Sequence, residues 1–184
     1  HKNREPYKIA VSVLASKEID IIAKDYNVEV IHIKDSHSAM MDATIDESVL
    51  FVGNIHGGFI FRDFLFASDG MFAIGQIIEM LSKTGLKISD IDRNLPKRYY
   101  KYCEIRIPWE MKGYIMRRAI QYSESFPREL VEGVKIFYDD NSVVLLPNSE
   151  GASFFVYADA KNSSQCDQLI IEHQNLINKW KEEF

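Results

Sequence analysis

Two glycine-containing loops carry the residues whose types and spacing point to ligand binding. The first, 53–58 (GNIHGG), follows a short apolar strand, and its paired glycines let backbone N–H groups approach a ligand because no Cβ intervenes. The second, 147–153 (PNSEGAS), offers N–H groups, an amide and two hydroxyls that suit a phosphate. The candidate ligand-binding residues are Asn54, His56, Gly57 and Gly58 in the first loop, and Pro147, Asn148, Ser149, Glu150, Gly151 and Ser153 in the second.

Each loop also has a simpler interpretation. His56 either donates to a sugar hydroxyl or a phosphate, or is a solvated loop histidine, and the sequence leaves both interpretations open. In the second loop, Glu150 puts a negative charge where an anion needs a positive one, and no Arg or Lys lies within the loop. Composition alone therefore favours a plain connecting turn over a phosphate site there.

The elements before and around the first loop alternate between strand and helix. This rhythm predicts a mainly parallel, three-layer α/β/α sheet domain, in which ligands bind beyond the carboxyl ends of the strands. The helix at 69–83 is apolar almost all round, so we expect it to be sandwiched between the sheet and another element, with Asp69 as its N-cap rather than a ligand. The expected strands are 7–14, 28–33 and 49–52, and the expected helices are 16–26, capped by Ser16, a brief one starting at Ser36 or Ser38, 69–83, and a short turn capped by Ser89.

The remainder of the chain has a different order of elements. A strand, an amphipathic helix, three strands and a final helix predict a small TBP-like α+β domain, with a boundary that divides the chain into 1–97 and 98–184. Lys112, Arg117 and Arg118 lie on the first helix, where they face an anion only if that helix borders the cleft. The expected strands are 99–107, 131–138, 142–146 and 153–159, and the expected helices are 108–126 and 164–181.

Composition excludes several classes of function. The 184 residues are 46% hydrophobic with a formal net charge of −5, which indicates a globular protein without the basic face that nucleic acid binding needs. Basic and aromatic residues mix at 97–102, but a charge-protected edge strand explains them better. No apolar run is long enough to span a bilayer, and two cysteines without metal-ligand spacing suit a reduced compartment. We expect a cytoplasmic protein without membrane or nucleic acid partners, and the opening HKNREP reads as the tail of a linker in a longer chain.

The order of landmarks resembles one family over nearly the whole chain, 7–177. GNIHGG, SDGMFAIGQIIEML and LVEGVKIFYDDNSVVLLPNSEGASFFVYADA match the frame of domains three and four of the α-D-phosphohexomutases, the phosphoglucomutase and phosphomannomutase relatives. In active members the first loop, with a Glu-x-Ser-Gly-His or Glu-x-x-Gly-Gly pattern, holds sugar hydroxyls. The second, Arg-Pro-Ser-Gly-Thr-Glu-Pro followed by a further Arg, binds the substrate phosphate. The resemblance therefore implies a hexose phosphate ligand.

Both loops depart from the family pattern. Asn54 stands where the sugar-binding Glu would be, while Leu146 and Phe155 stand where the two arginines would be. The motif Gly, Thr and Glu become Ser149, Glu150 and Gly151. A charge-assisted hydrogen bond contributes about 1.5 to 3 kcal/mol, so losing two arginines weakens phosphate binding by roughly two to four orders of magnitude. We expect hexose phosphate to bind weakly.

The family's catalytic groups have no counterpart in this chain. Family members transfer phosphate through a serine of the first domain and bind Mg²⁺ through an Asp-rich loop of the second, whereas Asp90-Ile91-Asp92-Arg93 follows the wrong element here. We therefore expect no catalytic residue, metal ligand or cofactor in this fragment, with Mg²⁺ bound by its parent enzyme.

Three parent proteins are compatible with the altered loops. The loops look most like those of the mutase-like module behind bacterial mannose-1-phosphate guanylyltransferase-type nucleotidyltransferases, whose fourth domain has a Leu-Pro-Asp type loop. The alternatives are the substrate-binding half of an active mutase and a structural module that forms homo-oligomers. In each case the rest of the parent chain is an expected partner.

Overall fold

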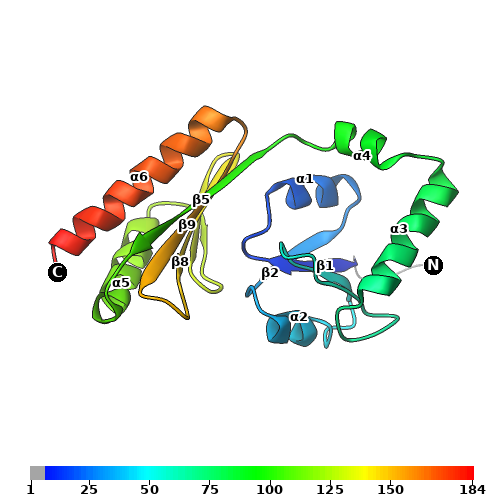
Figure 1. Cartoon of the computed structure of the whole chain (residues 1–184), viewed down its shortest axis with the longest axis horizontal. Helices are drawn as coiled ribbons and strands as arrows, with labels where there is room; N and C mark the ends of the chain where they lie inside the picture. Colours follow the sequence, from blue (N-terminus) through cyan, green and yellow to red (C-terminus); the bar gives the residue numbers. More distant parts are fainter. Residues whose placement is uncertain (1–6) are drawn as a thin grey trace. The chain divides into compact units, whose positions relative to one another are not determined.

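The chain forms two compact units, residues 1–97 and 98–184, and each has its own sheet (Figure 1). The structure, a computed structural model, describes residues 7–184. The expected linker at the start of the chain lies outside the described residues. No helix within 7–184 is long and apolar enough to cross a membrane.

The first unit is built on a four-stranded sheet in the order β2-β1-β3-β4. The first three strands are parallel, as expected, and β4 pairs antiparallel with β3 at the edge. Helices α1 and α2 lie on opposite sides of this sheet (Figure 1), and Met40 of α2 packs with Ala10, Val52 and Ile60 of the strands. The elements are β1 (Lys8–Ser12), α1 (Glu18–Asp25), β2 (Glu29–Ile33), α2 (His37–Ala43), β3 (Val49–Gly53) and β4 (Phe59–Phe61).

Side-chain caps explain where two of these helices begin. Ser36 caps α2, since its Oγ accepts the Ala39 N–H at 3.2 Å. The expectation that Ser16 caps α1 was wrong by one residue. Lys17 occupies the cap position, and the Ser16 Oγ instead accepts the Glu18 N–H at 3.2 Å just outside the helix.

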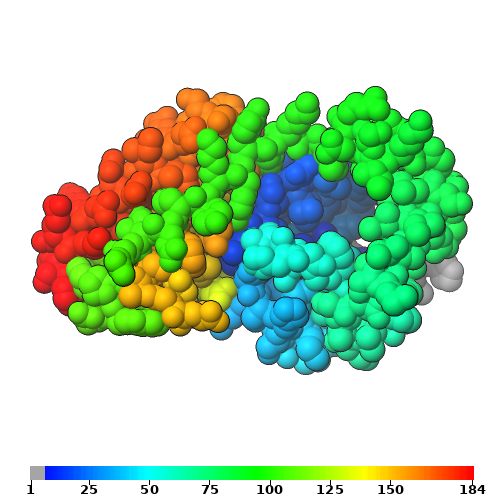
Figure 2. Space-filling view, viewed as in Figure 1, coloured from blue at the N-terminus to red at the C-terminus, as the bar shows by residue number. Residues whose placement is uncertain are grey.

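Helix α3 (Gly70–Thr84) begins and ends as expected but is not enclosed. The Asp69 carboxylate accepts the Phe72 N–H at 2.7 Å, and Gly85 ends the helix at φ 68°. The expected sandwich was wrong, because only Ala73 of this helix is buried and Met71 is 86% exposed. Figure 2 shows the segment of α3 at the surface. Its main contact is β4, a three-residue edge strand that covers one side only. In α4 (Ile88–Asn94), the cap position is Lys87 rather than Ser89.

The second unit is a five-stranded antiparallel sheet, in the order β5-β9-β8-β7-β6, with two helices on one face. Inward side chains of the strands form a core with Ile115 of α5 and Ile177 and Trp180 of α6. Sequence reasoning missed the two-residue β6 and the short 3₁₀ turn η1 between Pro108 and α5, just as it missed β4 in the first unit. The elements are β5 (Tyr99–Arg106), η1 (Trp109–Met111), α5 (Lys112–Ser123), β6 (Arg128–Glu129), β7 (Val134–Tyr138), β8 (Asn141–Pro147), β9 (Ser153–Ala160) and α6 (Ser163–Glu182). The mixed α/β fold class is confirmed.

Candidate functional site

The first loop is a tight reversal between β3 and β4 that Asn54 closes. Its Oδ1 accepts the backbone N–H of His56 at 2.9 Å and that of Gly58 at 3.0 Å. Its backbone N–H donates to the Gly58 carbonyl at 3.1 Å. Asn54 therefore uses its acceptor oxygen to fold the loop.

The remaining residues of the first loop differ in their surroundings. Gly57 has φ 87°, a conformation that a residue with a side chain rarely adopts. A Cβ on Gly58 would meet the Ser68 Oγ at 3.2 Å. The His56 side chain is 69% exposed and its Nε2 lies 3.1 Å from the Asp35 carboxylate, which follows β2. This pair joins the carboxyl ends of two parallel strands, where a ligand-binding role of His56 stays a prediction.

The second loop, between β8 and β9, is also closed by an asparagine. The Oδ1 of Asn148 accepts the N–H groups of Glu150 at 3.0 Å and Gly151 at 3.1 Å, and its Nδ2 donates to the Ser153 Oγ at 2.9 Å. Pro147 ends β8, and Ser149 and Glu150 are exposed at the tip. Two N–H groups that a phosphate nest would use are thus bound within the loop.

Helix α5 supplies a cation that the loop itself lacks. The Lys112 ammonium donates to the carbonyl oxygens of Asn148 and Gly151, and it lies 3.5 Å from the ring centroid of Trp109. Sequence reasoning left open whether this helix faces the loop, because nothing local to Lys112 indicates it. Because the Lys112 ammonium already donates to two carbonyl oxygens, its role here is to hold the loop.

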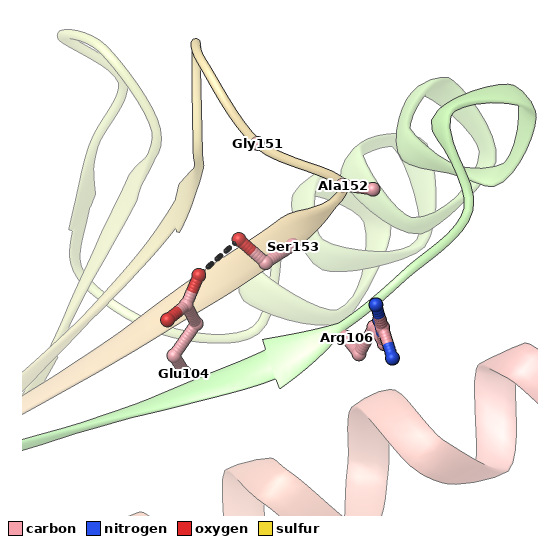
Figure 3. Close-up of a pocket in the computed structure, with 5 residues that line it drawn as sticks. All are labelled: Glu104, Arg106, Gly151, Ala152 and Ser153. Atoms are coloured by element: carbon pink, nitrogen blue, oxygen red, sulfur yellow. Dashed lines mark hydrogen bonds between the residues drawn. The ribbon is translucent and has the colours of Figure 1, made fainter.

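An open cavity of about 410 Å³ lies beside the second loop, lined by Glu104, Arg106, Gly151, Ala152 and Ser153 (Figure 3). Ser153 donates from its Oγ to the Glu104 carboxylate at 2.5 Å. Arg106 is exposed, and it pairs with Ser153 in the register of β5 and β9. Sequence reasoning missed both β5 residues, although the alternation of this strand does place them on its wet face.

The buried titratable groups of the second unit form a separate polar network. His173 is 2% exposed, and its Nδ1 lies 2.8 Å from the Leu169 carbonyl and its Nε2 2.9 Å from the Tyr138 hydroxyl. Burial lowers the pKa of His173 and raises the pKa of Tyr138, so both side chains are neutral at pH 7. His173 is therefore a core residue whose two ring nitrogens both have hydrogen-bond partners.

The described residues do not form a metal centre. Within 7–184, no group of three or more His, Cys, Asp or Glu side chains lies close enough to hold an ion. Asp90 of the acidic turn in α4 instead pairs with Arg93 at 2.7 Å. A Mg²⁺ ion therefore has no fitting set of ligands in this part of the chain.

The chain is similar to proteins named as sugar-phosphate mutases over most of its own length. It is 28% identical over 177 residues to a phosphoglucosamine mutase of Methanocaldococcus jannaschii, covering 94% of this chain and 39% of that protein. It is 23% identical over 163 residues to a phosphoglucomutase/phosphomannomutase of Thermococcus kodakarensis, covering 88% of this chain and 36% of the relative. The chain therefore spans roughly two fifths of the length of these relatives.

The same fold occurs in solved structures. A phosphoglucomutase/phosphomannomutase family protein of Burkholderia thailandensis matches with a TM-score of 0.81 at 13% identity, over 96% of this chain and 38% of that one. An N-acetylphosphoglucosamine mutase of Aspergillus fumigatus matches with a TM-score of 0.71 at 8% identity, over 95% and 39%. The family model described as phosphoglucomutase/phosphomannomutase, alpha/beta/alpha domain III, matches residues 1–99. Because this match covers more than half of the 184 residues of the chain, the chain belongs to the phosphoglucomutase/phosphomannomutase family.

Proposed function

We propose that this chain is the substrate-contacting part of a phosphohexomutase-like protein, and that it holds a hexose or hexosamine phosphate weakly. The observation that supports weak binding is that polar groups of the second loop already form hydrogen bonds within the protein. Asn148 binds two of its N–H groups, and the Lys112 ammonium is bound to two of its carbonyl oxygens. A loop so closed offers few donors to a phosphate.

In this proposal each of the two units contributes one of the two loops to substrate contact. Residues 1–97 contain the loop at the sugar-binding position, and 98–184 act as the family's fourth domain, with the loop at the phosphate-binding position. The Ser153 hydroxyl of the second loop lies beside a carboxylate, that of Glu104, but its oxygen also accepts from the Asn148 amide, and both contacts hold the loop. We therefore assign the reacting groups to another part of the parent protein. The chain then contributes substrate contacts and no chemical step.

For the parent protein, we propose the mannose-1-phosphate guanylyltransferase type, supported by the loss of the loop arginines. An active mutase is the second candidate, and the mutase names of the curated relatives favour it. Enzyme assays of the full-length parent protein distinguish these two candidates. GTP-dependent consumption of mannose 1-phosphate without mutase turnover supports the first, and mutase turnover overturns it.

Binding by the chain itself is tested by NMR titration with glucose 6-phosphate and glucosamine 6-phosphate. We expect amide shifts in 53–58 and 147–153 with dissociation constants in the millimolar range, roughly −4 kcal/mol. Glucose without phosphate should shift only the first loop. Unchanged spectra at tens of millimolar ligand would overturn the proposed role in substrate contact.

A further inference from the structure

We propose that Arg106 of β5 is the residue that binds the ligand's phosphate at the second loop. It does so in place of the loop arginines whose positions are taken by Leu146 and Phe155. This inference rests on the proposed function, since it names the group that contacts the sugar phosphate. It differs from the family's arrangement because the cation comes from a neighbouring strand.

The arginines of the second unit differ in whether their guanidinium groups already have partners. Arg98 pairs with Asp159 at 2.6 Å, Arg118 pairs with Glu183 at 2.8 Å, and Arg128 donates to the Ile120 carbonyl at 2.6 Å. Among the described residues, the guanidinium of Arg106 has no hydrogen bond or ion pair. Its donors are therefore available to an anion at no cost in broken contacts.

The position of Arg106 is set by the sheet. Because Arg106 stands opposite Ser153, it borders the point where the loop enters β9. Figure 3 shows its guanidinium on the far side of Ser153 from Glu104, near Ala152 at the rim of the cavity. A phosphate in this cavity would meet a planar pair of donors, which matches the oxygen spacing of a phosphate.

Glu104 shares the cavity and opposes anion binding. Its Oε1 accepts from the Ser153 hydroxyl at 2.5 Å and from the Asn148 amide at 3.4 Å, so the carboxylate is held in place beside the loop. Glu104 and Arg106 lie two residues apart on one face of β5, about 7 Å along the strand. At that distance the carboxylate lowers anion affinity without pairing with the guanidinium.

Removing the charge of Arg106 and removing the charge of Glu104 should change phosphate affinity in opposite directions. Phosphate affinity is measured by NMR titration of the whole chain with inorganic phosphate and with glucose 6-phosphate, at low salt. Arg106→Gln should weaken both by about tenfold, the low end for a charge-assisted bond because the site is open to water. Glu104→Gln should tighten both severalfold. Arg117→Gln is the matched control, since Arg117 is an exposed arginine of the same unit without a partner among the described residues, and it should change neither.

The outcomes separate this inference from the proposed function. If the wild-type chain binds glucose 6-phosphate and Arg106→Gln binds it as well as Arg117→Gln does, the inference is overturned and the proposed function stands. If inorganic phosphate binds through Arg106 while sugar phosphates shift no residue of 53–58, the inference stands and the proposed function fails. Absence of all binding by the wild-type chain overturns both. Unchanged amide spectra outside the cavity confirm that each variant is folded.

Discussion

Replacing Gly133 by alanine should destabilise the second unit and displace the strand that leads into the second loop. Gly133 is buried just before β7, and a Cβ there would lie 2.2 Å from the carbonyl oxygen of Leu145 on β8. The obstacle is backbone rather than a flexible side chain. Leu145 also pairs with Val134 on one side and Val156 on the other, so it cannot move without distorting both ladders.

The magnitude follows from the overlap. Ordinary contact begins at 3.4 Å, so the strands must separate by about 1 Å at this point. Overpacking of this kind costs about 1 to 3 kcal/mol, and a distorted ladder hydrogen bond adds about 1 kcal/mol. We expect Gly133→Ala to lose about 2 to 4 kcal/mol of unfolding free energy, a large fraction of the total for a domain of this size.

Urea unfolding followed by tryptophan fluorescence measures this change in the second unit alone, because both tryptophans, Trp109 and Trp180, lie there. The matched control is Gly113→Ala in α5, where a Cβ meets nothing within 4 Å. That variant should gain up to about 1 kcal/mol, since alanine is the better helix former. Equal unfolding midpoints for Gly133→Ala and the wild type would refute the steric argument.

Three further perturbations test other parts of the structure. Burial lowers the pKa of His173 in the folded chain, so on acidification this histidine binds a proton in the unfolded chain first. The free energy of unfolding should therefore fall as the pH drops below about 6.5, by at most about 1.4 kcal/mol per pH unit from this residue. Urea titrations at several pH values should show a smaller slope in His173→Gln, and an equal slope would contradict the assignment. Asn54→Ala loses two hydrogen bonds and should destabilise the first unit by about 1 to 2 kcal/mol. Faster amide exchange at 56–58 checks this, and unchanged exchange would show that Asn54 does not hold the loop. Lys112→Met should free the carbonyls of Asn148 and Gly151 and so speed amide hydrogen exchange at 149–152. Exchange as slow as in the wild type would contradict the anchoring role of Lys112.

Local features of the sequence were enough to predict most elements. Ser36 and Asp69 cap their helices, Gly85 ends α3 in a left-handed conformation, and Asp139 turns the β7–β8 hairpin at φ 52°. Each of these depends on interactions within a few residues. The class of the fold followed from the order of such elements, because a strand–helix rhythm leaves few ways to build a sheet.

Contacts between distant residues decided what these patterns could not. The apolar composition of α3 indicated a buried helix, yet burial depends on which surfaces meet it, and one short edge strand covers it here. The second loop contains no cation, but strand pairing brings Arg106 beside it and α5 brings Lys112 into it. The sequence by itself determined where the loops lie and which polar groups they own. The tertiary structure decided which of those groups are already bound and which charges surround them, because hydrogen bonds and charge act through space rather than along the chain.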